Sequence, residues 1–172
     1  MYIKPSIIKD VAISASPFLV SVPFTAFDLN QFDSDDSKAL WQPPGYVFGI
    51  VWPILYLSLF VMNYNIFNND KLSKSFKNTI ARDTLIEAGL QGLWLYSFRY
   101  IKKIAGRFKS QYLSGVTILF SLVGFGAYRV YNFVFNKEKV STIKYLYLYL
   151  PYFVWINFAS ILGLQLYLGI TK

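Results

Sequence analysis

The sequence predicts an all-α membrane protein, a bundle of five transmembrane helices. Hydrophobic residues make up 55% of the 172 positions, and the charged residues fall mainly between long apolar segments. The clearest such segment covers residues 44–67, because no charged residue occurs between Lys38 and Asp70. A helix that rises ~1.5 Å per residue crosses the hydrocarbon core with about 20 apolar residues, so this segment is long enough to span a bilayer.

Five helices are expected within one domain that covers residues 1–172. In chain order, they cover residues 7–27, 44–67, 79–101, 112–135 and 142–170. The first follows a short basic lead, but prolines interrupt its apolar run and no clear small-x-small cleavage site follows. We therefore interpret it as a retained helix rather than a signal peptide. The second opens at Pro43 and Pro44, since proline lacks an N–H that the first helical turn leaves unpaired anyway.

The third span carries a polar and aromatic stripe. Its members recur at steps of four, four, three and four residues, which places them on one helix face: Asp83, Glu87, Gln91, Trp94 and Phe98. Such a stripe must face inward, because a charged carboxylate in hydrocarbon costs on the order of 3 kcal/mol unless it is paired, hydrated or protonated. Glu87 either lines a cavity or forms a hydrogen bond with Tyr or Asn of a neighbouring helix, and the sequence leaves both interpretations open.

The fourth and fifth spans are apolar, with a few residues that indicate their environment. Gly115, Gly124 and Gly126 are expected where another helix approaches closely. Arg129, near the end of the fourth span, is expected to snorkel toward the head groups. The fifth span opens with tyrosines at alternate positions, which we expect in the aromatic belt of the interface: Tyr145, Tyr147 and Tyr149.

Aromatic residues also recur every four positions along one face of the second span, at Phe48, Trp52 and Tyr56. They belong to a longer motif, residues 41–56, which reads Trp-Gln-Pro-Pro-Gly-Tyr-Val-Phe-Gly-Ile-Val-Trp-Pro-Ile-Leu-Tyr. This motif resembles the Trp-x-Pro-Pro-x-x-Val-Phe-x-x-x-Trp-x-x-Leu-Tyr signature of the TspO/MBR family, which includes the tryptophan-rich sensory and translocator proteins and the peripheral-type benzodiazepine receptor. Residues 90–98 and 150–162 are similar to the third-helix and fifth-helix patterns of the same family.

The resemblance implies a TspO-like fold whose aromatic cavity takes a flat hydrophobic ligand, either a porphyrin or haem or a sterol or other lipid, beneath a lid formed by residues 28–39. No cofactor is required by this interpretation, and the expected partners are the bilayer, the ligand, and a second copy or a larger membrane complex. The predicted ligand-binding residues are Trp41, Pro44, Phe48, Trp52, Tyr56, Glu87, Gln91, Trp94, Phe98, Trp155 and Ala159.

Departures from the family pattern support a second hypothesis. The third-helix asparagine of the family is Gln91 here, the preceding glutamine is Glu87, and the asparagine that closes the fifth-helix pattern is Gly163. A fold tolerates such exchanges more readily than a ligand site does. The alternative function is therefore a structural accessory subunit of a larger membrane assembly, such as a mitochondrial respiratory complex, that keeps the fold while its pocket degenerates.

Composition excludes several other classes of function. The chain has no Cys and no His, which removes disulfides, thiol catalysis and the commonest zinc, copper and haem ligands. We expect neither a metal site nor an enzyme, although a porphyrin-degrading activity is sometimes attributed to the family. The net charge of +8 lies in short loops beside the spans, where it meets lipid head groups, so nucleic acid is not an expected partner.

Location in the cell is an expectation from the resemblance. A mitochondrial membrane is preferred because the family occurs there in eukaryotes, with a bacterial membrane as the alternative. More Lys and Arg lie in the N-terminus with the second and fourth loops than in the first and third loops with the C-terminus. This asymmetry predicts that the N-terminus faces the more negative compartment.

Overall fold

The computed structural model describes residues 5–25, 38–97, 108–138 and 140–170 of the chain. Within these ranges the chain forms five helices and no strand: α1 Pro5–Thr25, α2 Gly45–Phe67, α3 Lys74–Tyr96, α5 Phe108–Phe135 and α6 Ile143–Leu168. The predicted all-α class is therefore confirmed. The predicted lid, residues 28–39, lies almost entirely outside the described residues, and so does Phe98.

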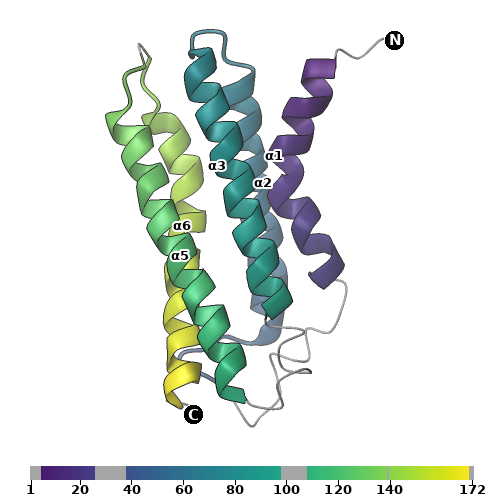
Figure 1. Cartoon of the computed structure of the whole chain (residues 1–172), viewed down its shortest axis with the longest axis vertical. Coiled ribbons are helices and arrows are strands. Elements are labelled where there is room, and N and C mark those ends of the chain that lie inside the picture. The colour runs from purple at the N-terminus through teal and green to yellow at the C-terminus, as the bar shows by residue number, and fades with distance from the viewer. Residues whose placement is uncertain (1–4, 26–37, 98–107, 139, 171–172) are drawn as a thin grey trace.

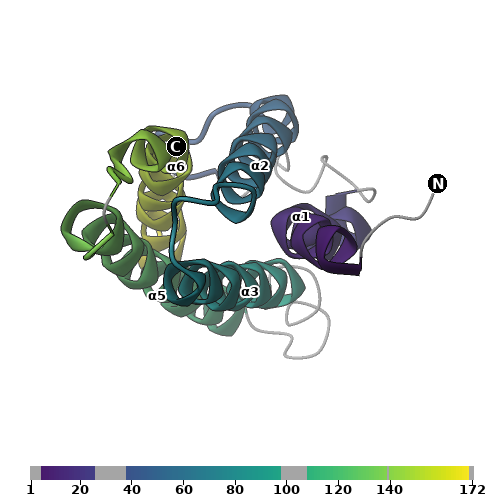
Figure 2. The ribbon, with the colours of Figure 1, turned by 90° about the horizontal axis from the view of Figure 1, so that it is seen from above.

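The helices run up and down along one axis (Figure 1). Viewed along that axis, α1, α2 and α3 lie together, and the α5–α6 hairpin lies beside α2 and α3 (Figure 2). Contacts join α1 to α2 and α3, α6 to α2, and α5 to both α3 and α6. The core therefore lies between α2, α3, α5 and α6, of which α2, α3 and α6 carry the sequence motifs.

The apolar helices are long enough to cross a bilayer. Among the described residues, three helices have both the length and the composition of membrane spans: Gly45–Phe67, Leu113–Phe135 and Ile143–Leu168. They present large apolar side chains outward, including Ile54, Leu57 and Val154. Such an outward apolar surface suits lipid tails rather than water, as expected for an integral membrane protein.

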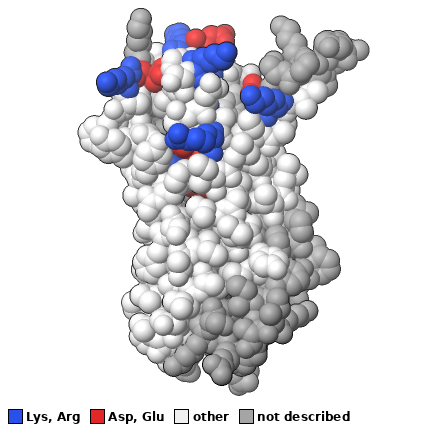
Figure 3. Space-filling view, viewed as in Figure 1, with Lys and Arg blue, Asp and Glu red and all other residues white. Residues whose placement is uncertain are grey.

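Among the described residues, most charged side chains lie at the end of the bundle where α1, α3 and α6 begin (Figure 3). We call it the charged end. Its described charged residues belong to the N-terminal parts of these helices and to the loops before α3 and α6: Lys9, Asp10, Asp70, Lys71, Lys74, Lys77, Arg82, Lys137, Glu138 and Lys144. Between this end and the apolar surface lies the level at which lipid head groups meet hydrocarbon.

Helix α3 begins at Lys74, several residues before the predicted start at residue 79. Ser73 is the reason, because its hydroxyl oxygen accepts a hydrogen bond from the backbone N–H of Phe76 at 3.1 Å, as an N-cap does. Ser73 also contacts Glu138 of the loop before α6 through both its N–H and its hydroxyl. Lys74 and Lys77, which precede the predicted start of this helix, thus belong to the first turn of a capped helix.

The tyrosines at the start of α6 do not share one environment. Tyr147 is 70% exposed, as expected for an interfacial belt, but Tyr145 and Tyr149 are only 2% and 0% exposed. The prediction was wrong for these two because residues four apart lie on the same helix face, whereas the residue between them points away. Tyr145 and Tyr149 therefore belong to the core.

Close helix packing is confirmed at Gly126 but not at Gly124. A Cβ atom at Gly126 would lie 2.6 Å from Cδ2 of Phe153 on α6 and 3.3 Å from Ile156. A Cβ atom at Gly124 would meet nothing within 4 Å. Gly126 thus lets α5 and α6 approach each other, as small residues do between membrane helices.

We predict that Gly126→Ala destabilises the protein relative to Gly124→Ala by about 1–3 kcal/mol, the usual cost of overpacking. Both substitutions gain the same helix propensity, so their difference isolates the contact with Phe153. Unfolding by SDS in mixed micelles, followed by circular dichroism, measures the difference. Equal stability of the two variants would show that Phe153 moves aside without cost.

Candidate functional site

Trp52 of α2 is the centre of an aromatic cluster. It stacks on Tyr56 at a centroid distance of 5.5 Å and lies 5.7 Å from Trp94 of α3. Edge-on contacts join it to Tyr152 and Trp155 of α6 at 6.5 Å and 6.3 Å. Rings at these separations attract each other beyond their area of burial. The cluster therefore joins three helices through residues that the sequence motifs contain.

A small cavity lies beside this cluster, away from the charged end. Its volume is about 40 Å³, and its walls come from the segment before α2 and from α2, α3, α5 and α6. The lining side chains among the described residues are apolar or small, apart from the Gln42 amide and the Trp94 indole: Gln42, Phe48, Trp94, Gly115, Val116, Leu119, Ala159, Leu162, Gly163 and Leu166. A volume of ~30 Å³ per water means that the cavity holds about one water molecule in this conformation.

Gln42 is held at the rim of the cavity by its own turn. Its side-chain oxygen accepts a hydrogen bond from the backbone N–H of Ala39 at 3.2 Å, while its N–H donates to the Ala39 carbonyl at 3.0 Å. Gln42 is 9% exposed, whereas its neighbour Trp41 is 61% exposed. The turn before α2 thus presents Gln42, rather than Trp41, to the interior.

The predicted site residues divide into several groups in the structure. Phe48, Trp94 and Ala159 line the cavity. Trp52, Tyr56 and Trp155 form the aromatic cluster behind it, and Trp155 also contacts Phe48 at 5.7 Å. Trp41 and Pro44 lie exposed at the helix start, and Glu87 and Gln91 lie in a buried polar network. Sequence analysis missed the wall from α5, Gly115, Val116 and Leu119, because no motif marks that helix.

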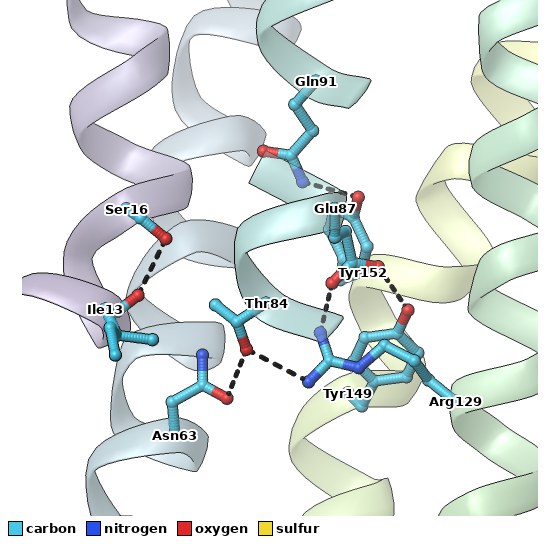
Figure 4. A network of polar contacts seen from close by, with 9 residues as sticks. All are labelled: Ile13, Ser16, Asn63, Thr84, Glu87, Gln91, Arg129, Tyr149 and Tyr152. Atoms are coloured by element: carbon cyan, nitrogen blue, oxygen red, sulfur yellow. Dashed lines mark hydrogen bonds and ion pairs between the residues drawn. The ribbon is translucent and has the colours of Figure 1, made fainter. Parts of the chain in front are cut away.

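Glu87 is the acceptor at the centre of the polar network (Figure 4). Its side chain is fully buried. One carboxylate oxygen accepts a hydrogen bond from Nη1 of Arg129 on α5, and the other accepts from the hydroxyl of Tyr149 on α6. Of the two interpretations left open by the sequence, the hydrogen bond to a neighbouring tyrosine is the one observed. The negative charge of Glu87 is compensated by Arg129, which sequence analysis had expected at the head groups.

Arg129 does not snorkel, and that prediction was wrong. The residue is 1% exposed, and its guanidinium carbon lies 4.9 Å from the Tyr149 ring centroid and 6.0 Å from that of Phe133. A lone arginine within a span would reach for water, but the carboxylate of Glu87 compensates its charge inside the bundle. The missed signal was a carboxylate and an arginine in neighbouring spans, each requiring a partner of opposite charge.

Further hydrogen bonds extend the network to α2. Arg129 Nη2 donates to the Thr84 hydroxyl at 3.4 Å, and that hydroxyl donates to the side-chain oxygen of Asn63 on α2 at 3.2 Å (Figure 4). One turn beyond Glu87, the Gln91 amide donates to the Tyr152 hydroxyl at 2.6 Å. Polar groups on α3 therefore bind α2, α5 and α6 at once.

A second ion pair connects the network to the charged end. Asp83 is fully buried, and its Oδ1 accepts hydrogen bonds from Nε and Nη2 of Arg82 at 3.0 Å and 2.8 Å. The Arg82 side chain is 59% exposed and also donates to the Tyr128 hydroxyl of α5 at 3.1 Å. Asp83 Oδ2 and Arg129 Nε are buried without a hydrogen-bond partner in the described part of the chain. Each buried acid is thus paired with an arginine, one at the rim and one inside.

We predict that Glu87→Gln and Arg129→Met each destabilise the bundle by about 3–5 kcal/mol, because each leaves an uncompensated buried charge. The double variant removes both charges and should cost at least ~2 kcal/mol less than the sum of the single variants. A double-mutant cycle of SDS unfolding measures this coupling. Strictly additive losses would contradict a direct pairing of the two side chains.

Comparison with known proteins agrees with the motifs and the fold. Residues 15–168 match the sequence model of the TspO/MBR family. The chain is also similar to the "Tryptophan-rich protein TspO" of Archaeoglobus fulgidus, with 23% identity over 145 residues that cover 84% of each chain. No solved structure matches the chain significantly. Because the family match covers most of its length, this helical membrane protein belongs to the TspO/MBR family.

Proposed function

We propose that this protein binds a flat hydrophobic molecule, a tetrapyrrole or a sterol, in the cavity beside the Trp52 cluster. The observation that carries the proposal is the cavity lined by Phe48, Trp94 and Ala159, since these residues come from the three helices that bear the family motifs. Aromatic walls with few polar groups are typical of sites for small apolar ligands. Binding without catalysis is proposed, because the cavity lining provides neither a carboxylate nor another strong base among the described residues.

Ligand binding requires the cavity to widen. Ligand pockets usually measure ≈300–1,000 Å³, whereas this cavity measures about 40 Å³. The wall from α5 and α6 includes small residues, Gly115, Ala159 and Gly163, and side chains that can change rotamer, such as Leu119 and Leu166. The polar network ties α5 and α6 to α3 nearer the charged end, so displacement is easiest at the end that holds the cavity. We propose that the ligand displaces these walls as it binds.

The small cavity also supports the alternative function. Rings of the Trp52 cluster pack on each other, and this packing occupies space that a ligand would need. A protein that keeps the fold only as a scaffold requires no open pocket. In that case, the chain would serve as an accessory subunit of a larger assembly, for which a mitochondrial respiratory complex remains the proposed example.

We predict that Ala159→Phe weakens the binding of protoporphyrin IX at least about tenfold, because the new ring fills the cavity. Val154→Phe is the matched control, since Val154 lies on the same helix and is 64% exposed toward the membrane. Quenching of tryptophan fluorescence in detergent micelles measures the dissociation constant, and circular dichroism checks that both variants fold.

Comparable binding by the two variants, or no binding by the wild-type protein, would contradict the cavity proposal. Native gels of mildly solubilised membranes then test the alternative function. A ligand-binding protein should migrate as a monomer or a dimer, whereas an accessory subunit should migrate with a large complex.

A further inference from the structure

A polar cleft lies at the charged end, between the C-terminal end of α2 and the first turns of α6. Its volume is about 690 Å³, far larger than that of the cavity beside Trp52. The cleft is lined by Asn65, Asn68, Asn69, Asp70, Lys71, Lys144, Tyr145 and Leu148. None of these residues belongs to a family motif or to the predicted ligand site.

Hydrogen bonds hold the wall of this cleft in place. The Asn69 amide donates to the Tyr145 hydroxyl at 2.9 Å, and the Asn69 side-chain oxygen accepts from the N–H of Lys71 at 3.0 Å. The next residue, Leu72, is 5% exposed and donates its N–H to the Asn69 carbonyl at 3.1 Å. The loop between α2 and α3 is therefore anchored to α6, so the cleft exists before any ligand arrives.

The cleft offers positive charge that the protein does not use. Within the described chain, neither Lys71 nor Lys144 has a carboxylate at ion-pair distance. The Lys144 ammonium lies 4.9 Å from the centroid of the Tyr145 ring, and both side chains line the cleft. Asp70 is the carboxylate in the lining, and it leaves the cleft with a net charge of +1 (Lys71 and Lys144 against Asp70). The cleft thus attracts an anionic group, and Lys71, Lys144 and the Tyr145 hydroxyl can donate hydrogen bonds to it.

An apolar surface continues from the cleft toward the middle of the membrane. Leu148 lies in the cleft lining, and its carbonyl accepts a hydrogen bond from Ser58 of α2, so α2 and α6 are in contact here. Helical spacing places Val61 and Leu57 below Asn65 on the same face of α2, and they are 38% and 61% exposed. A polar cleft that leads into exposed apolar side chains fits a molecule with a charged head and an acyl chain.

We propose that this cleft binds one anionic glycerophospholipid. Its phosphate lies between the ammonium groups of Lys71 and Lys144 and accepts a hydrogen bond from the Tyr145 hydroxyl, while an acyl chain follows Val61 and Leu57. Basic residues beside a membrane span attract anionic lipids, and a fixed cleft converts that attraction into a site. The site is separate from the cavity of the proposed function, so either can fail without the other.

The test uses the full-length protein in nanodiscs that contain equal amounts of phosphatidylglycerol and phosphatidylcholine. Native mass spectrometry after release counts the phosphatidylglycerol molecules that remain bound. We expect the wild-type protein to retain one such lipid, and Lys71→Gln/Lys144→Gln to reduce its occupancy about tenfold or more. Lys9→Gln/Lys74→Gln is the matched control, because it removes the same charge from exposed positions at the same end of the bundle.

Retention of lipid by the control, together with its loss from the cleft variant, supports the site. An equal loss from both variants would overturn it, since that result indicates general attraction to a basic surface. A parallel sample contains inorganic phosphate at about 10 mM, a concentration low enough that salt screening stays weak. Displacement of the lipid by phosphate alone would overturn the lipid assignment in favour of a small-anion site.

Discussion

The structure depends on the compensation of charge inside the membrane. Glu87 and Asp83 lie fully buried on one face of α3, where an unpaired carboxylate would be too costly. Arg129 of α5 and Tyr149 of α6 meet this requirement for Glu87, and Arg82 meets it for Asp83. Because lipid tails provide no hydrophobic force between helices, such polar contacts and close packing select how the helices associate.

This network is also connected to the aromatic cluster. Gln91, one turn from Glu87, donates a hydrogen bond to Tyr152, and the Tyr152 ring contacts Trp52 edge-on. The side chains that hold the bundle therefore also position the rings beside the cavity. Nearer the charged end the helices are joined by the Arg129–Glu87 ion pair and by hydrogen bonds, whereas around the cavity they meet through small and apolar residues. The widening of the cavity that we propose for ligand binding would therefore break no ion pair of the polar network.

Position 87 illustrates how this chain uses the family fold differently. The family pattern has a glutamine there, which carries no charge, whereas Glu87 requires a cation. Arg129 provides it, and Tyr149 provides a second donor. Without Arg129, the carboxylate of Glu87 would be a buried charge without a cation, which would weaken the bundle. The departure from the family pattern is thus part of the packing of this chain, in addition to its consequence for ligand specificity.

Sequence patterns predicted much of the fold, because hydropathy and helical spacing are properties of one segment at a time. Three features were predicted in this way: the apolar length of residues 44–67, the inward stripe of α3, and the shared helix face of Phe48, Trp52 and Tyr56. The start of α3 was not predicted, because the lysines after Ser73 suggested a loop and the Ser73 N-cap was not recognised. The prediction for Arg129 failed because it was made from one helix without the Glu87 partner on another. The prediction for Tyr145 and Tyr149 failed because alternate positions do not share a helix face.

The amino-acid sequence by itself determined that this chain crosses a membrane as helices. A long apolar segment is more stable in lipid than in water, and in lipid its backbone N–H and C=O groups must form hydrogen bonds with each other. It also determined that one face of α3 points into the bundle, because polar residues at helical spacing lie on one face and that face must be shielded from lipid. Only the tertiary structure decided that Arg129 meets Glu87, that Gln42 rather than Trp41 borders the cavity, and that Asn69 contacts Tyr145 beside Lys71 and Lys144. These contacts depend on the register between helices distant in the chain, which no single segment encodes.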